Sequence, residues 1–156
     1  MSRFEPSPLF RFANEMVIPL IRWGLPMGVR RAPMALLTVR GRRSGIPRTK
    51  PVALAGLDGG WLLVAVYGVS DWSLNLEAAR EADVTVRGET TRVDARRLPP
   101  HEAAPILRDS IADAPAMVRR MTSRYFAASI ESSLDAWAQE SVEHPVFHLT
   151  PARSLV

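Results

Sequence analysis

A short segment rich in cationic side chains is the first part of this sequence that could do chemistry. Residues 40–51 read RGRRSGIPRTKP. A tight turn exposes backbone N–H groups that can bind an anion, and Arg offers a planar fork suited to phosphate and carboxylate. Because the two strands of a hairpin lie side by side, cations on both sides of the turn can converge. The segment therefore predicts a site for a ligand with several negative charges, although a solvated hairpin tip is the plainer alternative.

The charge distribution supports the same interpretation. The chain has 156 residues, a net charge of +4 and no cysteine. Residues 1–50 carry a net charge of +8 and residues 51–156 carry −4, and no acid lies between Glu15 and Asp58. Such a cationic region attracts anions such as nucleotides, carboxylated phosphodiesters or nucleic acid. Without cysteine, disulfides, thiolate metal sites and a Cys nucleophile are excluded.

A second segment could hold a planar ring. Residues 64–76 read VAVYGVSDWSLNL, an apolar strand that ends in Tyr67-Gly68, turns, and enters a helix with Trp72 and Asn75. Glycine lets a flat ligand approach the backbone, and aromatic side chains can hold a ring. The alternative is an ordinary strand–turn–helix corner. No metal site, catalytic triad or GxGxxG nucleotide motif is evident, and the histidines are expected to be structural or to lie on the surface.

The order of elements predicts one domain over residues 1–156, α+β in class, with an antiparallel barrel. Turn signals at residues 41–45, 58–60 and 88–89 separate the expected strands. We expect an N-terminal amphipathic helix at about 8–24 and a helical segment at about 101–140. The remaining elements are strands at 34–40, 48–57, 61–67, 83–87, 90–98 and 144–150, and a helix at 71–80.

The N-terminal helix has two interpretations. Its apolar residues recur at helical spacing, and Pro19 is expected to kink or end it. We favour a helix packed on the core over a flap or a membrane-surface helix with Trp23 at the interface. The longest uncharged run has 12 residues, from Gly59 to Ser70, too short to cross a bilayer. A cytoplasmic protein is therefore expected, with peripheral membrane contact through this helix left open.

Together the two segments resemble the deazaflavin-dependent nitroreductase family. The resemblance is carried by R-G-R-R-S-G-x-P-R-T-x-P, the strand ending in Tyr-Gly, and D-W-x-x-N-L, and runs from about Leu36 to Leu98. It implies a split β-barrel of the FMN-binding type with flanking helices, and the coenzyme F420, whose phosphate and glutamate tail suit a basic hairpin. This chain has Val66-Tyr-Gly-Val69 where well-known members have Ser-Lys-Gly-Gly.

The resemblance also implies which residues hold the cofactor. Those that would bind the phosphate and tail are Arg42, Arg43, Ser44, Gly45, Arg48, Lys50 and Pro51. Those that would surround the ring are Val66, Tyr67, Gly68, Trp72 and Asn75.

By the same resemblance, the chain would pass a hydride from reduced F420 to a quinone, a nitroaromatic or an activated alkene. Tyr67 and Ser73 are candidate proton donors, and Tyr125 could line the acceptor pocket, although a packed helix face is the favoured interpretation of Tyr125. A non-catalytic split barrel that binds FMN or haem is the alternative. Nucleic-acid binding is disfavoured because no aromatics alternate with the arginines. A homodimer is expected, as split barrels often pair.

Overall fold

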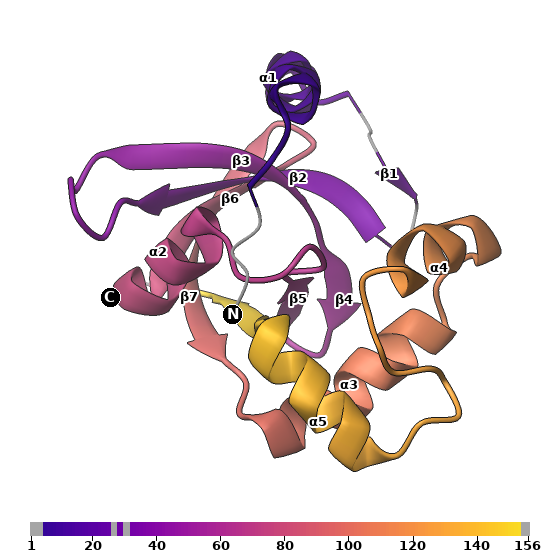
Figure 1. Ribbon diagram of the computed structural model, residues 1–156. Helices are drawn as coiled ribbons and strands as arrows, with labels where there is room; N and C mark the ends of the chain where they lie inside the picture. Colours follow the sequence, from indigo (N-terminus) through magenta and orange to yellow (C-terminus); the bar gives the residue numbers. More distant parts are fainter. Residues whose placement is uncertain (1–4, 26–27, 30–31, 154–156) are drawn as a thin grey trace.

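The computed structural model describes residues 5–25, 28–29 and 32–153, and its centre is a curled antiparallel sheet flanked by helices (Figure 1). The strands run in the order β1-β2-β6-β7-β8-β5-β4, and β3 pairs with β2. Their bounds are β1 Gly28–Val29, β2 Ala32–Arg40, β3 Pro47–Ala53, β4 Ala55–Leu57, β5 Gly60–Val64, β6 Glu81–Val86, β7 Glu89–Arg97 and β8 Val146–Pro151.

The strand expected at 48–57 is two strands, which corrects the sequence prediction. β3 pairs with β2 as far as Ala53, whereas β4 pairs with β5. Between them Leu54 is fully buried, and its N–H donates to Pro33 O at 3.0 Å. The strand pairing therefore changes at Leu54, whose side chain packs in the core. Because β3 pairs near one end of the strand order and β4 lies at the other end, their connection joins the two ends of the sheet, as in a barrel.

Two hydrophobic cores lie on opposite sides of the sheet. The first fills the curl between β2, β6, β7 and β8, and helix α2 (Asp71–Ala79) closes it with Leu76. The second lies between β5, β8 and the C-terminal helices and contains Trp137 and Val146. Arg80, in the left-handed conformation at φ 60°, ends α2 one residue earlier than expected and turns the chain into β6.

Helix α1 (Pro8–Arg22) lies across the outer side of β2, β3 and β6 (Figure 1). Ser7 caps it by accepting the N–H of Phe10 at 3.2 Å, and Pro8 occupies the first turn, where a missing N–H is harmless. Pro19 lies inside the helix and does not end it. Ile21 is fully buried and anchors the C-terminal end of α1. The apolar face expected to pack on the core is largely exposed, with Leu9, Phe12 and Met16 each more than half accessible to solvent.

Three further helices form the segment expected at 101–140. They are α3 (Pro100–Ala112), α4 (Ala116–Ser123) and α5 (Leu134–Glu143). The segment is interrupted at Pro115 and in the loop between α4 and α5. Within the described residues, no helix is long and apolar enough to cross a membrane.

Candidate functional site

The basic turn between β2 and β3 is held by its own hydrogen bonds. Gly41 N–H donates to Ile46 O at 3.0 Å, and Gly45, at φ 70°, donates to Gly41 O at 2.8 Å. The Ser44 hydroxyl accepts the N–H of Ile46 at 3.2 Å. Ser44 and Gly45 therefore shape the turn, and its charge comes from the neighbouring arginines.

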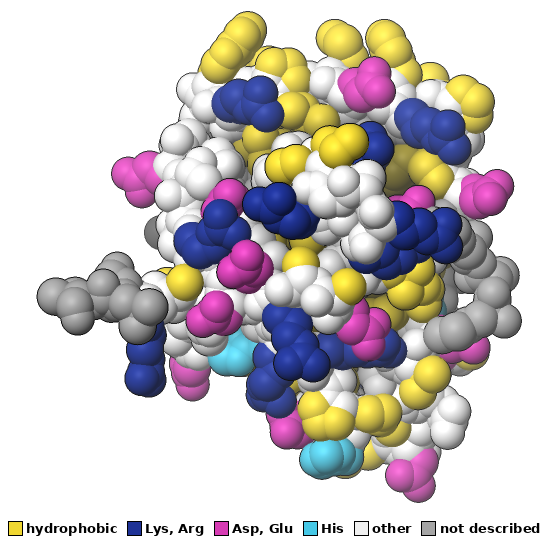
Figure 2. Space-filling view, turned by 90° about the vertical axis from the view of Figure 1, so that its left-hand side faces the viewer, with side chains coloured by type: hydrophobic (Ala, Val, Ile, Leu, Met, Phe, Trp, Pro, Cys, Tyr) yellow, Lys and Arg dark blue, Asp and Glu magenta, His cyan; other side chains and the backbone are white. Residues whose placement is uncertain are grey.

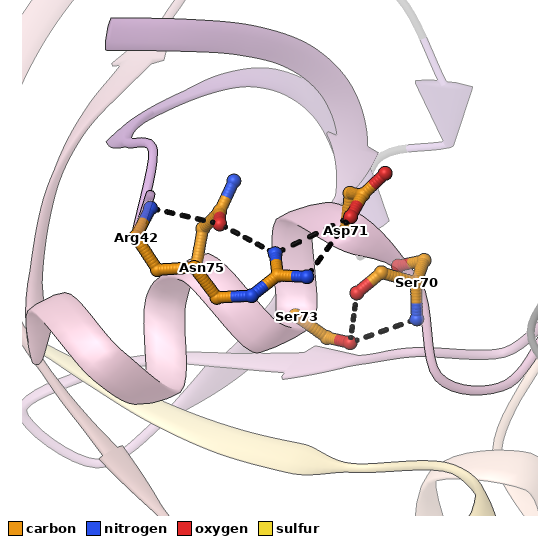
Figure 3. A network of polar contacts seen from close by, with 5 residues as sticks. All are labelled: Arg42, Ser70, Asp71, Ser73 and Asn75. Atoms are coloured by element: carbon orange, nitrogen blue, oxygen red, sulfur yellow. Dashed lines mark hydrogen bonds and ion pairs between the residues drawn. The ribbon is translucent and has the colours of Figure 1, made fainter. Parts of the chain in front are cut away.

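Arg42 reaches from this turn to the start of α2 (Figure 3). Its Nη1 donates to Asn75 Oδ1 at 2.8 Å, and its backbone N–H donates to the same oxygen at 3.1 Å. Both Nη1 and Nη2 lie 3.3 Å from Asp71 Oδ1. Asn75 is 6% exposed. A buried amide oxygen thus fixes the guanidinium beside the first turn of α2.

The strand register places two more cations on the same side of the hairpin as Arg42. Arg48 and Lys50 lie opposite Val39 and Leu37, and these two apolar residues face the core that α2 closes. Residues paired across strands point to the same face. Arg48 and Lys50 are exposed, as is Arg43 in the turn. Figure 2 shows Lys and Arg side chains on this side of the molecule, interspersed with Asp and Glu.

The opposite face of the hairpin carries threonines in place of the cations and is covered by α1. Thr38 and Thr49 share a hydrogen bond of 2.8 Å there, on the side over which α1 packs. Pro51 pairs with Leu36 on this second face. Pro51 is therefore not brought together with Arg48 and Lys50, because successive strand residues alternate between faces.

The corner after β5 differs from the expected long strand. β5 ends at Val64, and a turn follows in which Gly68, at φ 95°, donates its N–H to Ala65 O at 2.9 Å. Tyr67 is consequently 41% exposed. The strand prediction through residue 67 is wrong because the chain must turn before α2 can reach the hairpin.

Tyr67 lies at the centre of an aromatic cluster that joins distant parts of the chain. Its ring makes edge-to-face contacts with Phe10, at a centroid distance of 5.5 Å, and with Tyr125, at 4.8 Å. Burial, and then the neighbouring Tyr125, raise the pKa of the Tyr67 hydroxyl. Tyr125 follows α4, is 40% exposed and faces Tyr67, so it does not lie on a packed helix face. Sequence reasoning missed Phe10, because no short-range pattern relates it to Tyr67.

One candidate proton donor and two expected ring residues have structural contacts. Ser73 is 1% exposed; its hydroxyl donates to Ser70 O at 2.9 Å and accepts Ser70 N–H at 3.0 Å (Figure 3). Because the Ser73 hydroxyl already donates its proton to Ser70 O, Ser73 is not positioned to donate a proton to a substrate. Trp72 packs on the first core, 6.2 Å from the Phe147 ring, and Val66 packs on the second core.

A buried acid and histidine connect the two segments that carry the tyrosines. His144 Nδ1 lies 3.1 Å from Ala65 O, two residues before Tyr67. Glu140 Oε1 accepts the N–H of Ala128 at 2.7 Å, three residues after Tyr125, and Glu140 Oε2 lies 3.6 Å from His144 Nε2. This pair confirms a structural role for His144. Sequence reasoning did not find Glu140, although it stands one helical turn before His144.

No set of three His, Cys, Asp or Glu side chains in the described ranges could hold a metal ion. The candidate site consists of a cationic face, a glycine turn and an aromatic cluster near the start of α2. These are the parts with which a split barrel can hold a planar ligand that carries a charged tail.

Solved structures share the fold. A domain-swapped dimer is 18% identical, with a TM-score of 0.54, and the match covers 92% of this chain and 99% of that chain. An F420-H2 dependent reductase is 21% identical, with a TM-score of 0.52 and coverage of 78% and 99%. The haem storage protein HutZ from Vibrio cholerae is 15% identical, with a TM-score of 0.51 and coverage of 90% and 91%. The fold is thus the FMN-binding-like split barrel that the resemblance implied.

A family comparison makes the assignment specific. The model of the F420H(2)-dependent quinone reductase family matches residues 24–128, more than half of the chain. The chain belongs to this family. The resemblance to an F420-dependent split-barrel family is confirmed, and F420 is the cofactor of the family, with FMN only an alternative. The protein is accordingly an F420-dependent oxidoreductase.

Proposed function

We propose that this protein reduces a quinone with F420H2 at the start of α2. The observation that carries the proposal is the shared face of the hairpin, where the Arg42 guanidinium held by Asn75 stands with the exposed Arg48 and Lys50. Cations fixed on one rim fit a ligand with a phosphate and several carboxylates better than one with a phosphate alone. The F420 tail has this chemistry, so the residues present fit the cofactor.

The residues have distinct roles in binding. Arg42, Arg43, Arg48 and Lys50 would hold the phosphate and tail, and Ser44 and Gly45 would keep the turn in shape. Gly68 has a positive φ, a conformation that favours glycine. Because glycine has no side chain, a ring could approach the backbone at this turn. Val66, Tyr67, Trp72 and Asn75 would form the surroundings of the ring and its linker. When bound, the reduced deazaflavin supplies the hydride.

Tyr67 is the proposed proton donor. A quinone that accepts a hydride also needs a proton at its oxygen, and a phenol hydroxyl at the edge of the site can donate one. The raised pKa of Tyr67 keeps this hydroxyl protonated at neutral pH. Tyr125 and Phe10 would form an apolar wall beside it for a flat acceptor. The chain thus positions the acceptor and holds a proton next to it.

A titration and a turnover assay test the proposal. Purified protein is titrated with oxidised F420 and, in the same salt, with FMN, and binding is followed by fluorescence. It is then mixed anaerobically with F420H2 and a short-chain quinone, a nitroaromatic or an activated alkene. We expect binding of F420 in preference to FMN, and the fastest oxidation with the quinone. Binding of FMN alone, or of F420 without turnover of any acceptor, would favour the non-catalytic module instead.

We also propose that the protein forms a homodimer through α1. Leu9, Phe12 and Met16 lie at helical spacing, and each is more than half exposed. Figure 2 shows hydrophobic side chains along the upper edge of the molecule, where Figure 1 places α1. A second copy would remove this apolar surface from water. Peripheral membrane contact through the same helix is the competing outcome.

A further inference from the structure

Asp71 occupies the position at Arg42 where an anionic ligand would bind. Its Oδ1 lies 3.3 Å from both Nη1 and Nη2, so one carboxylate oxygen bridges the end of the guanidinium fork (Figure 3). Oxygens of a phosphate or of a ligand carboxylate seek the same donors. The Asp71 side chain is 67% exposed, whereas that of Arg42 is 22% exposed.

Asn75 also holds Arg42 in position. Asn75 Oδ1 accepts from both the backbone N–H and Nη1 of Arg42, at 3.1 and 2.8 Å, and Asn75 is itself buried. These are shorter contacts than the two with Asp71. The exposed carboxylate can also be solvated after it leaves Arg42, so its removal from the fork has a small cost.

We propose that Asp71 is an intramolecular competitor for the anion at Arg42. It compensates the guanidinium charge while the ligand is away and lowers the affinity for the ligand, both by occupying the fork and by repelling an incoming anion. The inference rests on the proposed function in one respect, namely that an anionic group of the cofactor binds at Arg42. A cofactor that is consumed in stoichiometric amounts must leave after each turnover, and a built-in competitor speeds its release.

The test compares Asp71→Asn with Glu77→Gln. Both changes remove one negative charge from α2, but Glu77 pairs with Arg97 at 2.9 Å and does not contact Arg42. Binding of inorganic pyrophosphate is measured by calorimetry at low salt, and binding of oxidised F420 by fluorescence. We expect Asp71→Asn to bind both probes about three- to tenfold more tightly, with slower release of F420, as the loss of one nearby exposed charge suggests. Glu77→Gln should change either affinity by less than about twofold.

A double-mutant cycle ties the gain to Arg42. In an Arg42→Ala background, Asp71→Asn should give a clearly smaller gain, because the competitor then has no fork to occupy and only its charge repulsion is removed. Unchanged or weaker binding of both probes by Asp71→Asn would overturn the inference and make Asp71 irrelevant or a support for Arg42. An equal gain from Glu77→Gln would also overturn it, since net charge would then explain the effect.

The two probes separate this inference from the proposed function. If the unmodified protein binds no F420 while Asp71→Asn still binds pyrophosphate more tightly, the proposed function fails and the competitor role of Asp71 stands. If F420 binds but neither probe responds to Asp71→Asn, the competitor role fails and the proposed function stands. A gain for pyrophosphate alone would contradict the link to the cofactor, because F420 would then not use Arg42.

Discussion

At the scale of single residues, Tyr67 combines chemistry with position. Its ring is part of the aromatic cluster, and it directly precedes Gly68, where the chain turns toward α2. Changing Tyr67 to Phe keeps the ring contacts and removes the hydroxyl. We expect kcat for quinone reduction to fall about 10²-fold, the lower range for general acid catalysis, with F420 affinity little changed. Stopped-flow oxidation of F420H2 measures this; a rate equal to that of Tyr125→Phe would contradict the assignment.

The pH dependence follows from the direction of the Tyr67 shift. Its pKa lies above the ordinary 10.0 because burial disfavours the phenolate. A raised pKa retains the proton to higher pH, so the donor form persists through neutral pH and is lost only above pH 10. We expect kcat to lose no Tyr67-dependent activity between pH 7 and pH 9, a range below the ordinary pKa of the phenol. A descending limb in this range that is absent from Tyr67→Phe would contradict the prediction.

The exposed cations should act on binding more than on folding. We expect the double variant Arg43→Ala/Arg48→Ala to weaken F420 binding about tenfold or more at low salt and to change the Tm little, because both side chains are exposed. Raising the salt concentration should reduce the difference in F420 affinity between the double variant and the unmodified protein. Arg40→Ala is the matched control: Arg40 pairs with Pro47 on the other face of the hairpin. Equal affinity of the double variant and the unmodified protein would rule out the tail site.

At the scale of elements, the Glu140–His144 pair joins α5 to the two tyrosine segments. Glu140→Ala leaves the Ala128 N–H without its 2.7 Å acceptor. Loss of a hydrogen-bond partner inside the protein costs roughly 1–3 kcal/mol. We therefore expect a lower free energy of unfolding and a higher KM for the quinone, as the Tyr67–Tyr125 contact loosens. Denaturant unfolding and turnover assays measure both. Glu143→Ala, an exposed acid on the same helix, should change neither.

The β5–β8 pair depends on a glycine for its close approach. A Cβ at Gly60 would overlap the Leu149 carbonyl oxygen, so no larger residue fits without moving β8. We expect Gly60→Ala to reduce the free energy of unfolding by roughly 2–4 kcal/mol, in the range of strongly destabilising mutations. Gly56→Ala on neighbouring β4, where a Cβ would meet no atom within 4 Å, is the control. A difference below about 0.5 kcal/mol between the two, within the range of surface substitutions, would disprove the packing argument.

At the scale of the whole molecule, α1 connects the proposed acceptor site with the proposed dimer surface. Phe10 contacts Tyr67, whereas Phe12 on the same helix is 61% exposed. We expect a dimer by light scattering, and a monomer after Phe12→Glu, because a buried charge without a partner is costly. A monomer before mutation, together with sedimentation on lipid vesicles, would favour membrane contact instead.

The features that the sequence by itself predicted are those set by short-range residue patterns. The order of helices and strands, the tight turns and the cationic hairpin follow from spacing, glycine and charge, which act over a few residues. The resemblance of residues 36–98 added the cofactor family, which the family model confirms. The division of the return strand at Leu54 escaped prediction, because it depends on which strands pair.

Tertiary structure decided which residues form the site. Arg42 and Asn75 meet because α2 packs beside the hairpin, and Phe10, Tyr67 and Tyr125 meet because α1 and α4 approach the same corner. No short-range pattern encodes such contacts, since each depends on how whole elements pack. The Ser73 hydroxyl is hydrogen-bonded to Ser70 O at the start of α2. The strand register places Pro51 on the face opposite to Arg48 and Lys50. Sequence thus determined the chemical groups available, and packing determined which of them can act together.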